Sequence, residues 1–274
     1  MSNAWFSAKL APDGDTKDGV HPEEAQAMKN YLRIRTTANE AAHAITRPTE
    51  RANNPNEDLA RLWAFLGDAL MEIPEIRTEC LVALLQAIED LPKPNMSHVE
   101  KQNLPAHGEL WRGLPGFGHH WADMYRASDW RTSVAKAKSP SERGSLFALH
   151  SRKANVEARL AVAGLGGMTI DWGYECVADA LEQEIADVAV LKFEISGAAE
   201  WLIIACDRFK EGAAKSEESW GLERRNDLWK SGKTMTPGRW SFWEGRLRTL
   251  IDRTRGNVRD RARKALERME IPSS

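Results

Sequence analysis

Residues 110–125 concentrate side chains that could bind or transform a ligand. This stretch reads LWRGLPGFGHHWADMY and holds two Trp, a Phe, a Tyr, two adjacent His and an Asp. Its Gly-Leu-Pro-Gly-Phe-Gly core predicts a tight turn, because glycine reaches backbone conformations closed to other residues and proline fixes φ. We expect a helix to begin at His119. That helix would place His119 and Asp123 on one face, and His120 and Met124 on the neighbouring face.

Three interpretations of this segment stay open. In the first, its aromatic side chains form a rigid corner that packs helices together, with the histidines half-exposed. In the second, they line a pocket for an apolar small molecule, and His119 or His120 acts as general base or hydrogen-bond donor, oriented by Asp123. In the third, His119 and Asp123 are metal ligands. Two ligands one turn apart do not make a site, however, and the sequence offers no obvious third ligand.

A second aromatic and acidic cluster follows the glycine-rich stretch 164–167. Its members are Asp171, Trp172, Gly173, Tyr174 and Glu175. One interpretation is a loop that ends at a helix N-terminus, where the helix dipole favours carboxylates. In the other, the cluster faces the first segment, so that Trp, Tyr and carboxylate meet the histidines across a cavity of the kind that binds small molecules.

The candidate site joins these two clusters. The candidate catalytic residues are His119, His120 and Asp123. The candidate substrate-binding residues are Trp111, Phe117, Trp121, Tyr125, Trp172, Tyr174 and Glu175. The sequence contains neither a Cys-x-x-Cys pair nor a His-Glu-x-x-His motif, so we expect no metal and no cofactor. Cys176 has no basic neighbour in the sequence, and we expect its thiol to be unreactive.

The elements that position these residues are expected to be helices. Ala and Leu supply 61 residues, whereas Val and Ile supply 22, a balance that favours helix over sheet. No proline occurs between Pro140 and Pro237, which leaves room for uninterrupted helices. Capping residues followed by proline or by glutamate three positions on mark helix starts. These starts lie at Asn54, Ser97, Ser139 and Thr236.

Apolar residues recur with helical spacing through most of the chain. The most regular stripe comprises Val188, Leu191, Ile195, Ala198, Leu202, Cys206 and Phe209. A further stripe over residues 240–269 predicts one long final helix. The sequence therefore predicts an all-α protein, a single-domain bundle of roughly eight to ten helices.

The domain organisation follows from proline and composition. We expect residues 1–20 to be disordered or loosely packed and residues 21–274 to form the single domain. The best linker candidate is the Pro-containing loop near 92–107, which is short and has apolar faces on both sides that need partners. We therefore interpret it as a surface loop.

The charge balance argues against two classes of partner. The 38 basic and 40 acidic residues give a formal charge of −2, which provides no overall field for nucleic acid or an acidic membrane. Residues 239–270 hold ten basic and five acidic residues, which we interpret as a solvated helix face. No signal peptide or stretch of 18 apolar residues is evident, and the three cysteines make no disulfide framework, so we expect a cytoplasmic protein. The oligomeric state is left open.

The sequence also resembles a filamentous-fungal family catalogued as a domain of unknown function. The resemblance rests on Leu-Pro-Gly-Phe-Gly at 114–118 with its flanking Leu-Trp and Trp-Ala-Asp, and on two weaker strings, Ala-Ala-His-Ala-Ile-Thr at 41–46 and Leu-Trp at 62–63. It spans most of the chain from about residue 25. The resemblance implies an intracellular, helical fungal protein and supplies no catalytic residues. Some such families accompany natural-product pathways, which favours the pocket interpretation by association.

These observations lead to one functional hypothesis and one alternative. The hypothesis is that the protein binds an apolar, natural-product-like small molecule, with acid–base isomerisation or cyclisation as the chemistry available to it. The alternative is a non-catalytic helical interaction protein, whose eleven Trp residues serve packing and a partner interface.

Overall fold

The protein is all-α, as the sequence predicts. The computed structural model describes the chain except for residues 1–2, 11–18, 106–108, 224–226, 231 and 272–274. The described residues form α-helices and short 3₁₀-helices, and they contain no β-strand, only two isolated β-bridges. The helices are more numerous than the sequence predicts, because stretches predicted to be continuous are interrupted.

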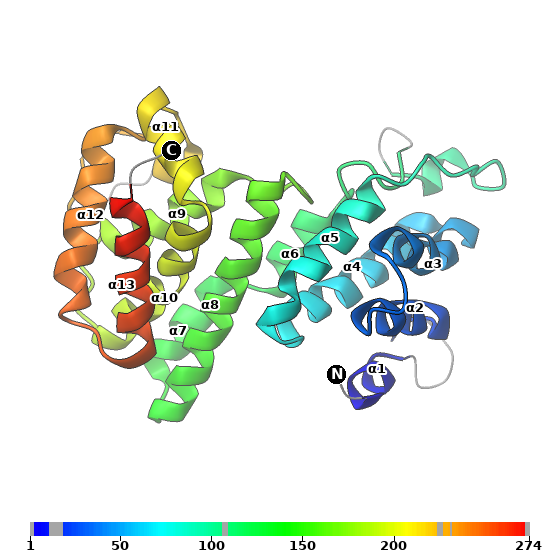
Figure 1. Cartoon of the computed structure of the whole chain (residues 1–274), viewed down its shortest axis with the longest axis horizontal. Helices are drawn as coiled ribbons and strands as arrows, with labels where there is room; N and C mark the ends of the chain where they lie inside the picture. The colour runs from blue at the N-terminus through cyan, green and yellow to red at the C-terminus, as the bar shows by residue number, and fades with distance from the viewer. Residues whose placement is uncertain (1–2, 11–18, 106–108, 224–226, 231, 272–274) are drawn as a thin grey trace. The chain divides into compact units, whose positions relative to one another are not determined.

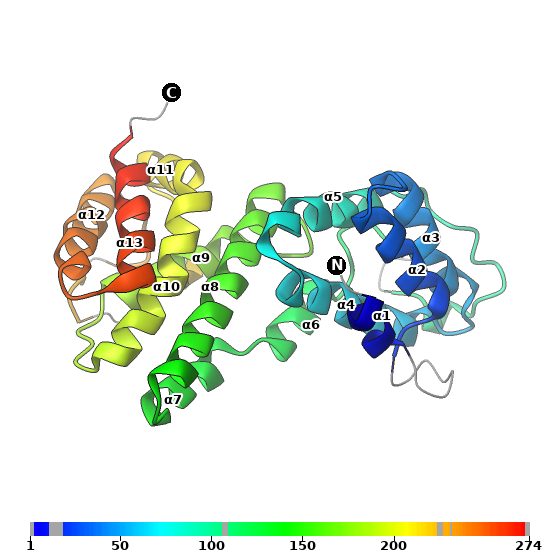
Figure 2. The ribbon, with the colours of Figure 1, turned by 60° about the horizontal axis from the view of Figure 1, so that its bottom comes forward.

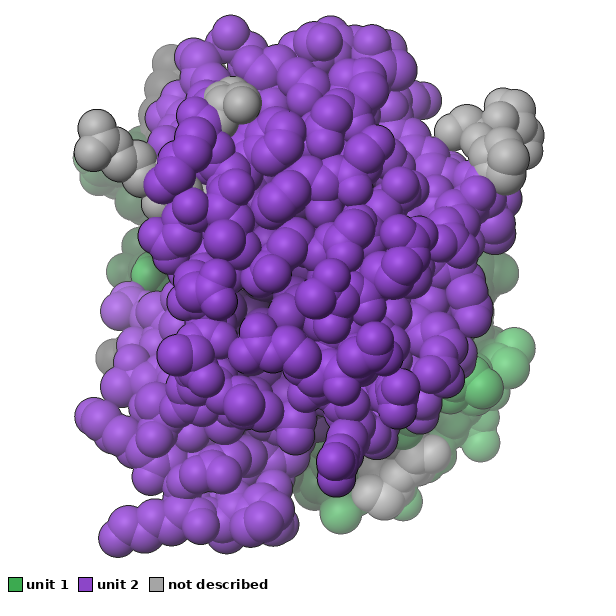
Figure 3. All heavy atoms as spheres, turned by 90° about the vertical axis from the view of Figure 1, so that its left-hand side faces the viewer, with its two compact units in different colours: residues 1–125, 165–167 green, residues 126–164, 168–274 purple. Residues whose placement is uncertain are grey.

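The chain divides into two compact units, which Figures 1 and 2 show as ribbons and Figure 3 shows in separate colours. Unit 1 comprises residues 1–125 and 165–167, and unit 2 comprises residues 126–164 and 168–274. The Pro-containing loop near 92–107 lies inside unit 1, so the division does not fall there. Whether the two units fold together as one domain stays a prediction.

Unit 1 holds the first predicted cluster. Its helices are α1 (Asn3–Lys9), α2 (Pro22–Leu32), α3 (Ala38–Arg51), α4 (Pro55–Glu72), η1 (Glu75–Arg77), α5 (Thr78–Glu89), η2 (Lys101–Asn103) and α6 (Phe117–Met124). Helix α3 packs against α2, α4 and α5, and α6 packs against α4. Of the expected loose N-terminus, residues 11–18 lie outside the described residues, whereas α1 is helical and buries Phe6.

Unit 2 holds the second cluster. Its helices are α7 (Ala127–Lys136), α8 (Pro140–Ala163), α9 (Ile170–Leu181), α10 (Val188–Ile204), α11 (Cys206–Lys215), η3 (Trp220–Leu222), α12 (Pro237–Ile251) and α13 (Gly256–Glu270). Helix α10 is the centre of this unit, since it packs against α7, α8, α9 and α13. The predicted apolar stripe along it is buried from Leu191 to Phe209, and Val188 at its start is exposed.

The predicted capping residues have mixed outcomes. Ser139 and Thr236 accept hydrogen bonds from the main-chain N–H groups of Glu142 and Arg239, both 3.1 Å long, and begin α8 and α12. Asn54 precedes α4 but makes no side-chain cap. The prediction at Ser97 is wrong, because no helix begins there. The main-chain N–H of Ser97 instead donates to the side-chain oxygen of Asn95 at 3.2 Å, a local hydrogen bond of a turn that competes with helix.

Two predicted helices are interrupted, which corrects the helix count. The single final helix is wrong, because α12 ends at Ile251 and α13 begins at Gly256, whose φ of 62° lies in the left-handed region. The stripe from Val188 to Phe209 likewise spans two helices that meet at Ala205. In both places the apolar spacing continues although the helical backbone does not.

Candidate functional site

The Gly-Leu-Pro-Gly segment forms the tight turn that the sequence predicts. The N–H of Leu114 donates to the carbonyl of Trp111 at 2.9 Å, and the N–H of Phe117 donates to the carbonyl of Leu114 at 3.0 Å. Gly113, Leu114 and Gly116 have φ values of 73°, 47° and 78°. This conformation is ordinary for glycine and uncommon for leucine. Helix α6 then begins at Phe117, two residues before the predicted start.

Aromatic side chains around this turn pack into one continuous cluster. Trp63 of α4 meets Trp111 and Phe117 edge-on, with ring centroids 6.4 and 5.6 Å apart. Phe117 stacks on Trp121 at 6.3 Å, and Trp121 contacts Tyr125 at 4.7 Å. Trp63, Trp111, Phe117 and Trp121 are each at most 2% exposed. These rings therefore form the core that supports the turn, as in the packing interpretation of the segment.

Hydrogen bonds tie the cluster to distant helices. The indole N–H of Trp111 donates to the carboxylate of Glu50 at 2.9 Å, and the hydroxyl of Tyr125 donates to Asp68 at 3.0 Å. Burial raises the pKa of Tyr125 well above its ordinary value, and the charge of Asp68 raises it further, so the phenol stays a donor. The segment from Trp111 to Tyr125 is thus held at both ends by carboxylate partners.

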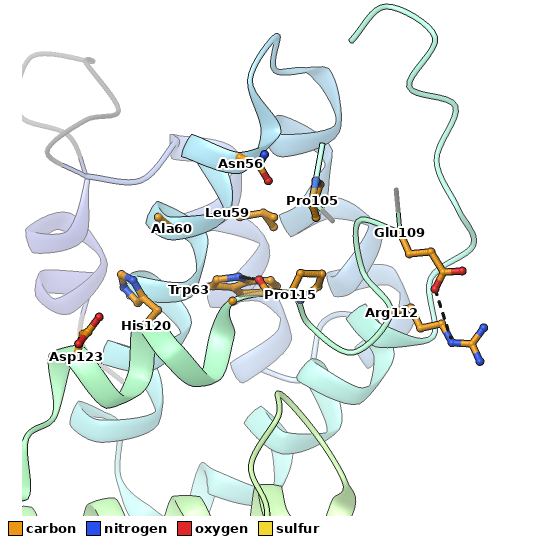
Figure 4. Close-up of a pocket in the computed structure, with 11 residues that line it drawn as sticks. Asn56, Leu59, Ala60, Trp63, Pro105, Glu109, Arg112, Pro115, His120 and Asp123 are labelled. Atoms are coloured by element: carbon orange, nitrogen blue, oxygen red, sulfur yellow. Dashed lines mark hydrogen bonds and ion pairs between the residues drawn. The ribbon is translucent and has the colours of Figure 1, made fainter. Parts of the chain in front are cut away.

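The predicted turn and helix border a pocket of about 960 Å³ in unit 1 (Figure 4). That volume is at the upper end of the range usual for small-molecule sites. The lining residues come from α4, from the loop before α6 and from α6 itself. They are Asn56, Leu59, Ala60, Trp63, Pro105, Glu109, Arg112, Pro115, Gly116, His120 and Asp123. The wall therefore combines apolar groups with an imidazole and charged side chains.

His120 is the polar group best placed for chemistry in this pocket. In Figure 4 its imidazole extends from α6 toward the part of α4 that carries Ala60 and Trp63. Its Nε2 is buried and has no hydrogen-bond partner among the described residues. Burial lowers the pKa of His120 from its ordinary value, while Asp123 and Asp68 act in the opposite direction. The imidazole is accordingly neutral at pH 7 and can accept or donate one hydrogen bond.

The structure brings part of the first candidate set to the pocket. His120 and Asp123 line it, three residues apart on α6. His119, on the same helix, is exposed and does not line it. Of the aromatic candidates, Trp111, Phe117, Trp121 and Tyr125 are packed behind the pocket in the aromatic cluster and are not among its lining residues.

A close backbone approach explains a glycine of the segment. A Cβ on Gly118 would lie 2.6 Å from the carbonyl oxygen of Gly166, a distance that backbone cannot accommodate without moving. A Cβ on Gly166 would lie 2.6 Å from the ring of Phe117. Helix α8 ends at this glycine-rich stretch, 164–167, with Gly164 as a left-handed C-cap. Gly118 thus allows this turn to pack against the start of α6.

The second cluster belongs to unit 2 and lines a different pocket. Trp172 and Glu175 border a cavity of about 280 Å³ that none of the first cluster's residues lines. Tyr174 is fully buried, and its hydroxyl donates to Glu217 at 2.9 Å. Asp171, which lies in the first turn of α9, accepts a hydrogen bond from the hydroxyl of Ser219. The helix N-terminus predicted at the second cluster is therefore present, as the start of α9. None of the second cluster's residues lines the pocket that contains His120.

Sequence reasoning missed several residues of the larger pocket. Trp63 was named only within the Leu-Trp string at 62–63, yet its ring forms a pocket wall. Arg112 and Glu109, whose charged groups lie 3.8 Å apart, were inside or next to the singled-out segment without being selected. Their opposite charges, three positions apart just before the turn, are the sequence feature that could have identified these two residues.

Metal centres and membrane-spanning helices are both absent from the described residues. Among the described residues, no group of three or more His, Cys, Asp or Glu side chains is arranged to hold a metal ion. No helix within the described part of the chain is long and apolar enough to cross a membrane. The expectation that the protein needs no metal or cofactor stays a prediction.

A family model described as a protein of unknown function, DUF3632, matches residues 63–247. The chain belongs to this family. The matched range begins at Trp63, later than the resemblance near residue 25 suggested, and includes the turn, all of α6 and the second cluster. Neither the curated proteins nor the solved structures contain a match to the chain. The description of the DUF3632 family states no activity, so the function proposed below rests on the pockets of this structure.

Proposed function

We propose that this protein binds an apolar small molecule with at least one polar group in the unit 1 pocket. The observation that carries the proposal is His120, whose buried Nε2 has no partner among the described residues although it lines a cavity of ligand size. A buried polar atom without a hydrogen bond costs free energy that a bound hydroxyl or carbonyl would recover. Trp63 and Leu59 supply apolar walls for the remainder of the ligand.

Acid–base chemistry on the ligand is the second candidate function, and the same residues support it. A neutral imidazole at His120 can take a proton from a carbon or hydroxyl next to a carbonyl. The nearby charge of Asp123 favours the imidazolium that then forms. Returning the proton to another ligand atom completes an isomerisation or initiates a cyclisation without any cofactor. A polycyclic, polyketide-like ligand has both the apolar area and the enolisable groups for such a step.

The test is binding of a polycyclic phenol to matched variants. We expect 1,8-dihydroxyanthraquinone to bind the full chain in isothermal titration, and His120→Ala to weaken binding by about tenfold or more, since one buried hydrogen bond contributes about 1 kcal/mol or more. His119→Ala is the control, because this neighbouring side chain is exposed and outside the lining. Each variant is checked for folding by a thermal melt. Equal binding by both variants, or no binding by the wild type, would favour the helical interaction protein.

A cytoplasmic location and a fungal source belong to the same proposal. The location is supported by the three cysteines, all of which are free thiols in the structure. The source is supported by the sequence resemblance alone.

A further inference from the structure

Two buried or half-buried histidines line the pockets of this protein, and they differ in what surrounds them. His150 of unit 2 is 4% exposed, and neither of its ring nitrogens has a hydrogen-bond partner among the described residues. Its Nε2 side lies against Gly197, where a Cβ could not fit, so the ring belongs to the packed interior. His120 of unit 1 differs, because charged side chains link its surroundings to the N-terminal helix α1.

Helix α1 docks on one face of α4 through aromatic and charged contacts. Trp5 stacks on Phe65 with ring centroids 5.7 Å apart, and its indole N–H donates to Glu72 at 2.8 Å. Lys9, at the other end of α1, places its Nζ 3.0 Å from Glu72 and 2.6 Å from Asp68. The three α4 residues are three and four positions apart, so they share one helix face. That face therefore holds α1 by a stacked ring and two ion pairs.

Asp68 joins this docking contact to the helix that carries His120. Its Oδ2 receives the ammonium group of Lys9, and its Oδ1 accepts a hydrogen bond from the hydroxyl of Tyr125 at 3.0 Å. Tyr125 directly follows α6, and its ring contacts Trp121 of that helix at 4.7 Å between centroids. A single carboxylate thus connects α1 to the C-terminal end of α6.

The charge of Asp68 also acts on His120. Burial lowers the pKa of His120, and the charges of Asp123 on α6 and Asp68 on α4 oppose that shift. The ammonium group of Lys9 partly cancels the field of Asp68, because the two groups are in contact. Undocking of α1 would remove this cancellation, so the imidazole would gain its proton at a higher pH.

Helix α1 depends on docking for its structure. It has seven residues, whereas isolated helices shorter than about 12–15 residues are marginal in water. It buries Phe6, and the ion pairs of Lys9 are partly exposed, so they contribute little stability. This limited burial opposes the entropy lost when the segment becomes ordered. Docking of α1 is therefore an equilibrium between two states of similar free energy.

We propose that α1 is a reversible strap, whose docking at Asp68 controls the imidazole of His120 in the unit 1 pocket. The docked strap holds the contact between Asp68 and Tyr125 in place and favours the neutral imidazole. The undocked strap releases that contact and favours the imidazolium, which cannot accept a hydrogen bond from a ligand. As regulation of the binding site proposed above, the strap rests on that proposal, and by linkage a bound ligand favours the docked state.

The test is an NMR titration of the histidines in the full chain without ligand, with His120 assigned by comparison with His120→Ala. We expect Lys9→Met to raise the pKa of His120, since the carboxylate of Asp68 loses its counter-charge. Trp5→Ala should raise it as well although it removes no charge, because it weakens docking of the whole helix. Lys9→Arg keeps the positive charge and should retain the wild-type titration.

Lys93→Met is the matched control, because Lys93 is an exposed residue of the loop after α5. Thermal melts establish that each variant folds. An unchanged pKa of His120 in Lys9→Met would overturn the proposal. A change in Lys9→Met without one in Trp5→Ala would overturn it too, because the effect would then come from one charge and not from a detachable helix.

Ligand binding by the same variants distinguishes the strap from the proposed function. At pH 6 we expect Lys9→Met and Trp5→Ala to bind 1,8-dihydroxyanthraquinone about fivefold more weakly than the wild type, the lower end of the coupling usual between two sites. Lys93→Met should bind it as the wild type does. No binding by the wild type would contradict the proposed function, whereas the titration without ligand still decides on the strap. Equal affinity of the wild type and all three variants would contradict control of the site by α1.

Discussion

The indole N–H of Trp63 donates a hydrogen bond to the main-chain carbonyl of Pro115, with 2.8 Å between nitrogen and oxygen. The two residues are far apart in the sequence, and their contact ties α4 to the turn before α6. Both also line the unit 1 pocket. One hydrogen bond thus helps to set the position of the pocket wall relative to His120.

Replacing Trp63 by phenylalanine should therefore destabilise the fold. The variant Trp63→Phe keeps an aromatic ring in the cluster and leaves the partly buried Pro115 carbonyl without its donor. We expect a loss of about 1–3 kcal/mol in the free energy of unfolding, measured by urea denaturation. Trp220→Phe is the control, because Trp220 is 49% exposed and should change stability by less than about 0.5 kcal/mol. Equal stability of the two variants would mean that the bond contributes nothing.

A second prediction concerns the close approach at α6. Gly118→Ala should destabilise, because the added Cβ meets the carbonyl of Gly166 and main-chain atoms must move. Gly144→Ala is the matched control. Gly144 lies in α8, is exposed and has open space around it, so alanine there should stabilise by up to about 1 kcal/mol. Thermal unfolding with opposite signs for the two changes is the expected result, and a stabilising Gly118→Ala would contradict the packing described here.

The core of unit 2 gives a third prediction. Leu202 lies in the middle of the buried stripe on α10 and is completely inaccessible. Leu202→Ala should cost roughly 2–5 kcal/mol, as for other buried leucines. Leu149→Ala removes the same atoms from a position that is 40% exposed and should cost much less. A loss below about half a kcal/mol for Leu202→Ala would mean that the stripe does not form a tightly packed core.

Features determined by local sequence were the ones that could be predicted. The caps at Ser139 and Thr236 depend on bonds to residues three positions ahead, so their residue types suffice to identify them. Breaks within apolar stripes were not predictable in this way. At Ala205 and Gly256 the backbone leaves the helix while the apolar spacing continues, so the spacing does not reveal the break.

The candidate site was predictable only in part, for a geometric reason. Phe117, Trp121 and Tyr125 are four residues apart, so they share one face of α6, and that face is turned to the aromatic core. His120 and Asp123 lie on another face, which borders the pocket. Composition identified the segment but did not say which face meets the ligand. Trp63 and His150 line their pockets because they pack against parts of the chain that are distant in sequence, and a single sequence does not reveal such contacts.

The last prediction is a pH dependence that originates at His150. Its pKa is lowered to about 3 by burial, with the charges of Lys153 and Arg131 acting in the same direction, whereas an unfolded histidine titrates near 6.5. Above about pH 6.5 both states are neutral, and the group has no effect. As the pH falls below that value the unfolded chain gains a proton that the folded protein excludes, so stability decreases until the pH approaches the folded pKa.

The expected result is a steeper loss of stability between pH 7 and pH 4 in the wild type than in His150→Gln, measured as the free energy of unfolding in urea. The difference in slope is at most about 1.4 kcal/mol per pH unit. Carboxylates such as Glu194 are present in both proteins and so do not account for the difference. His119→Gln is the control, because His119 is exposed and the change should leave the wild-type slope unaltered. Parallel pH profiles for wild type and His150→Gln would show that His150 is protonated as readily in the folded protein as in the unfolded chain, and its burial without partners would then be wrong.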